Sequence, residues 1–182
     1  MSIPENQPTP VTPVPPSGKY AQLSFIPTVG LTKLFIDIAA NPIPGYLQGP
    51  PWYSTFETNG LASYVDDLLT LQGITGLVTL QHDIVVTYKL TDNGSDSNVA
   101  TLPIGGTTVQ LGVSDAGGVL YKTVGDGFDF VSLRKYSNGV HDNMILRGTS
   151  VHSAGDVLRL QLLSTNSARV HMFGIHWVVK TI

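Results

Sequence analysis

Few residues in this chain have the types and spacing that catalysis requires. Gly112-Val-Ser114-Asp-Ala116 is one substitution away from the G-x-S-x-G pattern of a serine nucleophile. That pattern needs a helix directly after the serine, whereas Gly117-Gly118 follows here and indicates a turn. Neither glycine-rich phosphate-binding pattern occurs in the sequence. The sequence therefore predicts a protein that is not an enzyme and carries no cofactor.

The five histidines, His82, His141, His152, His171 and His176, are not spaced as a metal site. No pair has H-x-H or H-E-x-x-H spacing, and the chain has no cysteine to supply thiolates. His171 and His176 are five positions apart, so a regular strand would place them on opposite faces. We therefore predict no metal site, unless one histidine near a threefold axis is repeated three times in an assembly.

Two other groups of residues could bind ligands from loops. Asp92-Asn-Gly-Ser-Asp96 offers oxygen ligands but lacks the EF-hand spacing, so a polar hairpin tip explains it better. Trp52 and Tyr53 lie in the proline-rich stretch 41–53. Exposed aromatics there could stack on a sugar or dock on a partner, and burial over the end of a sandwich is the alternative.

The elements that must position these residues are strands. Segments rich in β-branched and aromatic residues alternate with glycine- and asparagine-containing turns, which is typical of a sandwich of antiparallel strands. The expected strands cover residues 20–26, 33–39, 77–90, 107–113, 119–124, 128–135, 143–151, 157–163 and 169–182. One short amphipathic helix is expected over 60–71, where apolar residues recur at helical spacing.

The last two strands have the clearest patterns. Leu158, Leu160 and Leu162 alternate with Arg159 and Gln161, which predicts a half-buried strand with the leucines facing the core. In 169–182, regular alternation places one set of residues on one face and a second set on the other. The first set is His171, Phe173, Ile175, Trp177 and Val179; the second is Val170, Met172, His176 and Val178.

Both sets of the final strand are largely apolar, so one would remain exposed on a monomer. We therefore expect this strand to contribute to a subunit interface of a homotrimer. His171, Phe173, His176 and Trp177 are its candidate interface or ligand-contacting residues, together with Trp52 and Tyr53.

The first 18 residues differ in composition from the rest. Half of the chain's 12 prolines fall here: Pro4, Pro8, Pro10, Pro13, Pro15 and Pro16. Proline-rich chain is extended and leaves its backbone open to partners. We divide the chain into an arm, 1–18, that binds a neighbouring protein through these prolines, and a single β domain, 19–182; a disordered tail is the alternative reading of the arm.

Composition restricts the partners. Charged residues make up 13% of the chain and hydrophobic ones 42%, so much of the surface is expected to be covered by other subunits. The net charge is −3 and no basic run occurs, which argues against nucleic acid. No apolar signal segment stands at the start, and no apolar run is long enough for a bilayer. We expect synthesis in a cytoplasm and no membrane partner.

The C-terminal stretch, from Ser153-Ala-Gly-Asp-Val-Leu-Arg-Leu to His-Trp-Val-Val-Lys180, resembles the end of C1q/TNF-like jelly-roll heads. In that group an "AGD"-type turn begins one strand and an aromatic-rich final strand closes the inner sheet. Similar heads occur on viral and phage capsid decorations, fibres and spikes. The resemblance implies a jelly roll of about eight strands, a trimer, and binding or assembly in place of catalysis.

The proline-rich arm, the low content of charged residues and the resemblance to C1q/TNF-like heads together favour one function. We expect a virion structural protein, a decoration or minor capsid trimer made in the host cytoplasm. Its arm would attach it to the major capsid protein or another virion protein. The alternative is the receptor- or carbohydrate-binding head of a viral fibre or spike, with a host glycan as its partner.

Overall fold

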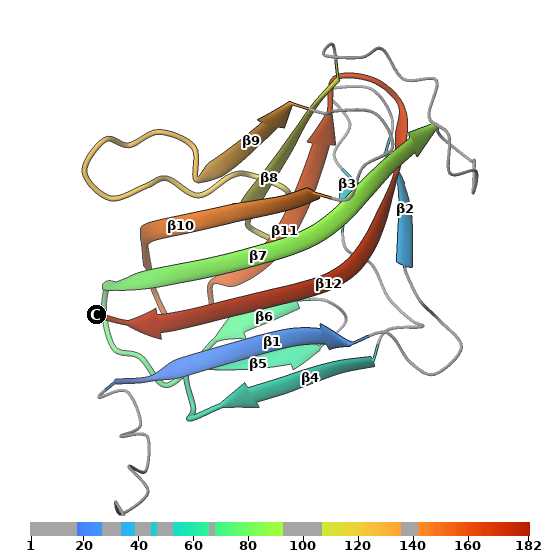
Figure 1. Cartoon of the computed structure of the whole chain (residues 1–182). Helices are drawn as coiled ribbons and strands as arrows, with labels where there is room; N and C mark the ends of the chain where they lie inside the picture. Colours follow the sequence, from blue (N-terminus) through green and yellow to red (C-terminus); the bar gives the residue numbers. More distant parts are fainter. Residues whose placement is uncertain are drawn as a thin grey trace, which may run out of the picture.

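The strands of this chain form two antiparallel sheets that face each other (Figure 1). The computed structural model describes residues 18–26, 34–38, 45–46, 53–65, 68–92, 107–135 and 142–182. Within these ranges it contains strands and no helix. The strands are β1 Tyr20–Ile26, β2 Leu34–Ile38, β3 Gly45–Tyr46, β4 Tyr53–Thr58, β5 Ala62–Val65, β6 Leu68–Leu71, β7 Val78–Asp92, β8 Thr108–Ser114, β9 Val131–Lys135, β10 Asp142–His152, β11 Val157–Ser164 and β12 Ala168–Thr181. The all-β class is confirmed, and two facing antiparallel sheets are consistent with a jelly roll.

The first sheet has the order β10-β7-β12-β1-β4, with β2 also paired to β12. The second has the order β5-β6-β11-β8-β9, with β3 also paired to β11. Strands β10 and β9 therefore each end a sheet, and they contact one another on the same side of the sandwich (Figure 1). We call this side the open edge.

Alternation along the strands builds the core. On β7, Leu80, Ile84 and Val86 face inward and are buried, while their odd-numbered neighbours face out. On β11, Leu158, Leu160 and Leu162 are all buried, which confirms the prediction from their spacing. Gln161 on the other face is also buried, at 3% exposure, so the strand is not half-buried there as expected. Apolar side chains at every second position let both inner faces pack together.

The helix expected over 60–71 is wrong. Residues 62–65 and 68–71 form the short strands β5 and β6, paired antiparallel from Ala62↔Leu71 to Val65↔Leu68. β6 also pairs with β11 through Leu69↔Leu158. The helical spacing of the apolar residues was real, but pairing with β11 supplies the backbone hydrogen bonds and the burial, and this tertiary context overrides a local pattern.

Three smaller expectations also differ. Residues 119–124 form no strand and make only isolated bridges, such as Ser114↔Leu120. Strand β9 starts at Val131, three residues later than expected, and β4 was not anticipated. More strands are described than the eight or so expected, because short segments such as β3 pair with β11.

A β-bulge in β12 corrects the predicted faces of the final strand. The register against β7 shifts between Met172 and Gly174, so Phe173 is the extra residue. A bulge reverses the side-chain alternation beyond it. The inner face therefore holds Ala168, Val170 and Met172 before the bulge and Ile175, Trp177 and Val179 after it, all of them buried.

The same bulge puts His171 and His176 on one face, the outer one, where they are paired with Lys89 and Val85 of β7. The prediction of opposite faces was wrong for this reason. Exposed His176 and half-buried Lys180 make the outer face partly polar. The second apolar face that the interface argument required therefore does not exist.

Some predictions lie outside the described residues. These are the prolines of the arm (Pro4, Pro8, Pro10, Pro13, Pro15 and Pro16), Trp52, His141, and the hairpin tip after Asp92. No helix in the described ranges has the length and apolar character needed to cross a membrane.

Candidate functional site: a buried polar network

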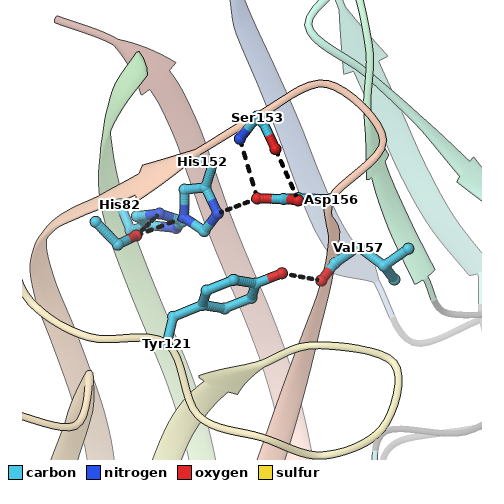
Figure 2. A network of polar contacts seen from close by, with 7 residues as sticks. His82, Tyr121, His152, Ser153, Asp156 and Val157 are labelled. Carbon is cyan, nitrogen blue, oxygen red and sulfur yellow. Dashed lines mark hydrogen bonds and ion pairs between the residues drawn. The ribbon is translucent and has the colours of Figure 1, made fainter. Parts of the chain in front are cut away.

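Four polar side chains meet inside the sandwich beside the open edge (Figure 2). Ser150 Oγ lies 2.9 Å from His82 Nε2 and 2.6 Å from His152 Nε2. His152 Nδ1 lies 3.5 Å from Asp156 Oδ2. His82, Ser150 and His152 are at most 1% exposed. Buried polar groups need partners. Ser150 Oγ and the Nε2 atoms of both histidines supply them to one another, whereas His152 Nδ1 has only the ionic contact with Asp156.

Strand geometry explains how these residues meet. His82 follows Leu80 on the inner face of β7, and Ser150 and His152 follow Met144 and Leu146 on the inner face of β10. The two strands are antiparallel neighbours, with His82 opposite Gly148. Side chains at every second position therefore point into the same layer.

The turn after β10 brings in the carboxylate. Gly155 has φ of 90°, a conformation that favours glycine and lets the chain reverse. Asp156 Oδ2 accepts the backbone N–H of Ser153 at 3.0 Å, and Oδ1 accepts the Ser153 hydroxyl at 3.1 Å. These bonds hold the carboxylate beside His152 (Figure 2).

Aromatic rings close the network. Trp177 Nε1 donates to His82 Nδ1 at 3.4 Å from β12. The Phe130 ring lies 5.1 Å from the His82 ring, and the Tyr121 ring lies edge-on to His152 at 4.4 Å, between centroids. The Tyr121 hydroxyl donates to Val157 O at 2.8 Å. Tyr121 is half-buried, and its ring contacts the buried His152 ring.

Tyr121 and Phe130 both belong to residues 115–130, which we call the β8–β9 segment. It projects beside β9 and β10 (Figure 1, yellow). The segment is tied to β10 by Val124 N–H, which donates to Thr149 O at 2.9 Å. It is tied to β8 by Tyr121 N–H, which donates to Val113 O at 3.0 Å.

A glycine on β10 makes room for the segment. A Cβ at Gly148 would lie 2.7 Å from Phe130 Cε2, inside the contact distance of carbon atoms. Phe130 is 1% exposed, so its ring has nowhere to move without disturbing the core. The absence of a side chain at Gly148 thus lets the Phe130 ring lie against the sheet next to His82.

Gly148→Ala should therefore lower the free energy of unfolding by about 1–3 kcal/mol, the usual cost of overpacking. The matched control is Gly174→Ala on β12, where nothing lies within 4 Å of the added Cβ. Chemical denaturation of both variants measures the difference. Equal costs would show that the Phe130 ring does not occupy the space above Gly148.

Burial governs the protonation of the network. Burial, with the neighbouring His152 as a smaller cause, lowers the pKa of His82 to about 3. Burial also lowers the pKa of His152, against the opposing effect of the Asp156 carboxylate. Burial raises the pKa of Tyr121 to about 12, with smaller contributions from Asp156 and Asp115. At neutral pH both histidines and the tyrosine are therefore uncharged.

Ser150, His152 and Asp156 lie in the order nucleophile, base and orienting carboxylate, as in serine hydrolases. Ser150 is fully buried, however, and a second histidine occupies its other side. A substrate carbonyl could not approach its Oγ without displacing the Tyr121 or Phe130 ring. This closed arrangement can hold the hydrogen-bonding protons of Ser150 and the histidines at defined atoms. No cluster of metal-binding type occurs in the described residues.

The residues singled out from the sequence lie elsewhere. Ser114 is buried at the end of β8, before the turn in which Gly118 N–H donates to Asp115 O. Trp177, on the inner face of β12, is 2% exposed. His171 is 1% exposed although it lies on the outer face of the same strand. Both side chains are therefore buried and are not surface candidates for an interface. His171 Nε2 lies 2.7 Å from Thr91 Oγ1.

The three other candidates lie elsewhere in the fold. His176 is exposed and contacts Ser24 Oγ through Nδ1 at 3.0 Å, and Phe173 is half-buried at the bulge. Tyr53 begins β4, away from the network. The structure brings none of these together into one site.

Sequence reasoning missed the network because it searched for histidines close together in the chain. His82 is about 70 positions from its partners, and Ser150-Val-His152 is not a metal-binding spacing. A signal was present only for His82, which occupies a core position in the alternation of β7. A polar residue at a core position indicates a buried contact.

The open edge carries exposed apolar side chains. Phe128 is 73% exposed and Leu133 64%. We define the open-edge surface as five exposed residues of the β8–β9 segment, β9 and β10: Val124, Phe128, Leu133, Ile145 and Val151. Leu133 and Ile145 line a common groove between β9 and β10. Exposed apolar groups that adjoin one another, as Leu133 and Ile145 do in this groove, are typical of interaction surfaces.

Comparison with known proteins adds little to the assignment of a function to this chain. No protein-family model and no curated protein matches the sequence. Among solved structures, murine APRIL at pH 5.0 is similar with a TM-score of 0.47 and 11% identity, over 89% of this chain and 99% of that one. Murine APRIL at pH 8.5 has a TM-score of 0.45 and 11% identity over the same shares. A similarity of this size assigns no ligand, assembly or function to the chain.

Proposed function

We propose that this chain is a non-enzymatic structural protein of a virion. It forms a jelly-roll trimer that decorates the capsid, and its N-terminal arm, residues 1–18, attaches it to the major capsid protein or another virion protein. The open-edge surface is the observation that carries the assembly part of this proposal. The proline-rich composition of the arm supports the attachment part.

The open edge suits contact with another copy of the chain. Among the described residues, β9 pairs only with β8 and β10 only with β7. Each therefore has a side without a neighbouring strand, which proteins commonly cover by association. Exposed Phe128, Leu133 and Ile145 add apolar area whose burial favours binding. Sister copies are the partner we propose, because a low content of charged residues favours covered surfaces.

A structural role also agrees with the closed network. Ser150 is the serine with the geometry of a nucleophile, and it is buried under the β8–β9 segment. The described residues show this polar cluster as part of the core, not as the wall of a pocket. This supports a function in assembly over one in catalysis.

Sedimentation of the full chain at micromolar concentration tests the assembly. We expect a trimer, and we expect Leu133→Glu to shift it toward monomer, because a buried carboxylate without a partner is costly. Leu77→Glu is the matched control, since Leu77 is 78% exposed in the turn before β7 and lies outside the open-edge surface. A wild-type monomer, or equal effects of both substitutions, would refute association through this surface.

Deletion of residues 1–17 tests the arm. We expect the truncated chain to keep its circular dichroism spectrum and to lose co-sedimentation with the virion particle. Full-length chain, mixed with the same particles, is the control. Unchanged attachment after truncation would contradict the role proposed for the arm.

A further inference from the structure

The network has only one consistent arrangement of hydrogen atoms when both histidines are neutral. Trp177 Nε1 can only donate, so His82 Nδ1 must accept and His82 must carry its proton on Nε2. That proton is donated to Ser150 Oγ, and the Ser150 hydroxyl is then donated to His152 Nε2. His152 carries its proton on Nδ1, which faces the Asp156 carboxylate. Hydrogen bonds thus run from Trp177 through His82 and Ser150 to His152, and the last donor, His152 Nδ1, makes no hydrogen bond but lies 3.5 Å from the Asp156 carboxylate.

One added proton disrupts this order. A proton on His82 would occupy Nδ1 and face the Trp177 N–H, placing two donors together. A proton on His152 would occupy Nε2 and remove the acceptor of the Ser150 hydroxyl. Ser150 could not turn to His82, whose Nε2 already donates to it. A buried donor without an acceptor carries the full cost of desolvation.

Movement of the β8–β9 segment would relieve that cost. The Tyr121 ring covers His152 and the Phe130 ring covers His82. Tyr121 is the half-buried member, so lifting it would admit water to His152. The segment makes its backbone connection to β10 through the hydrogen bond from Val124 N–H to Thr149 O, and this bond would break in the movement.

We propose that the network is a pH-sensitive latch: it holds the β8–β9 segment against β10 while both histidines are neutral and releases it when either histidine takes up a proton. The latch needs only the folded chain, so it does not rest on the proposed function. The segment carries Val124 and Phe128, so release would alter the open-edge surface.

Among the described residues, the ionisable groups that lie around the two histidines come from four elements. β7 contributes His82, β10 contributes His152, and the turn before β11 contributes Asp156. The β8–β9 segment contributes Tyr121, with Asp115 beyond it. The raised pKa of Tyr121 keeps it neutral in acid, and the lowered pKa values of both histidines mean that the closed state resists protonation. The histidines are thus the groups that take up protons on release at mildly acidic pH.

Hydrogen exchange of single amides, followed by NMR on the full chain between pH 7.5 and 5, tests the latch. The probe is the amide of Val124, and the reference is the amide of Gln72, which donates to Leu61 O at 2.7 Å by the far edge of the second sheet. The ratio of their protection factors removes the intrinsic effect of pH. We expect the opening constant at Val124 to rise, relative to Gln72, about tenfold per pH unit below the unperturbed histidine pKa for each histidine that takes up a proton on opening.

The variant His82→Gln/His152→Gln should abolish this rise. Glutamine carries one acceptor and one donor group, so it keeps both functions at each position without titrating. His176→Gln, which changes an exposed histidine on the outer face of β12, should leave the rise unchanged. If the double variant does not fold, ring-nitrogen chemical shifts of wild-type His82 and His152 provide the second measurement. They should report protonation in step with the opening at Val124.

Three results would overturn the latch. The first is no rise at Val124 in wild type. The second is an equal rise at Gln72, which would mean global unfolding in place of local release. The third is a rise that persists in the double variant, or wild-type rings that stay neutral while Val124 opens.

Discussion

Replacing Phe130 with alanine should lower the free energy of unfolding by about 3–5 kcal/mol, the largest effect we expect from a single substitution in this chain. Phe130 is among the largest fully buried side chains, at 1% exposure. Its ring packs on His82 and over Gly148, and it is the point at which the β8–β9 segment enters the core. Truncation would leave a cavity and would also expose the polar network to water.

Urea denaturation at pH 7.5 and fixed protein concentration measures this effect. Leu77→Ala is the control for removing a large apolar side chain, and because Leu77 is 78% exposed its cost should stay within about 0.5 kcal/mol. A cost for Phe130→Ala as small as that of Leu77→Ala would mean that the segment does not pack into the sandwich.

The second large effect is loss of stability in acid. The folded-state pKa of His82 lies near 3, below the unperturbed value of 6.5. The unfolded chain therefore binds a proton that the folded chain refuses, so the contribution of His82 is present above pH 6.5 and declines as the pH falls toward 3. From pH 7.5 to 5, His82 alone should lower the free energy of unfolding by on the order of 2 kcal/mol. The lowered pKa of His152 acts in the same direction.

The difference between wild type and His82→Gln isolates this contribution. Groups outside the network titrate equally in both proteins, so the two free energies of unfolding should converge as the pH falls from 7.5 to 5. His176→Gln should instead stay parallel to wild type over the same range. Wild type and His82→Gln that remain parallel would show that His82 is protonated in the folded chain, or is not buried.

Much of the architecture followed from the sequence alone. Alternation in β11 shows in residue types which side chains face the core, at Leu158, Leu160 and Leu162, and strands were expected where β1, β7 and β12 lie. The Asp115–Gly118 turn was also predicted, because glycine readily takes the positive φ that Gly118 has. These features are local, since they depend on strand periodicity and on the backbone freedom of single residues.

The tertiary structure decided the rest. Residues 62–71 have the spacing of a helix, and only the partner strand β11 makes them strands. The bulge at Phe173 exchanges the two faces of β12, and residue types on either side of it do not reveal it. Hydrogen bonds between strands that are distant in the sequence fix both features. The sequence of one segment does not identify the strand with which it pairs.

The polar network depends on both levels. The sequence of β7 indicates that His82 occupies an inward position, because it alternates with outward residues between Leu80 and Ile84. In β10 the outward residues Ile145 and Val151 are also apolar, so residue types alone do not place Ser150 and His152 inward. The antiparallel register of β7 and β10 places His82 Nε2 2.9 Å from Ser150 Oγ. A shift of this register by one residue would turn one of the two side chains outward. Register is a property of the strand pair. The order of hydrogen-bond donors and acceptors in the network therefore exists only in the folded chain.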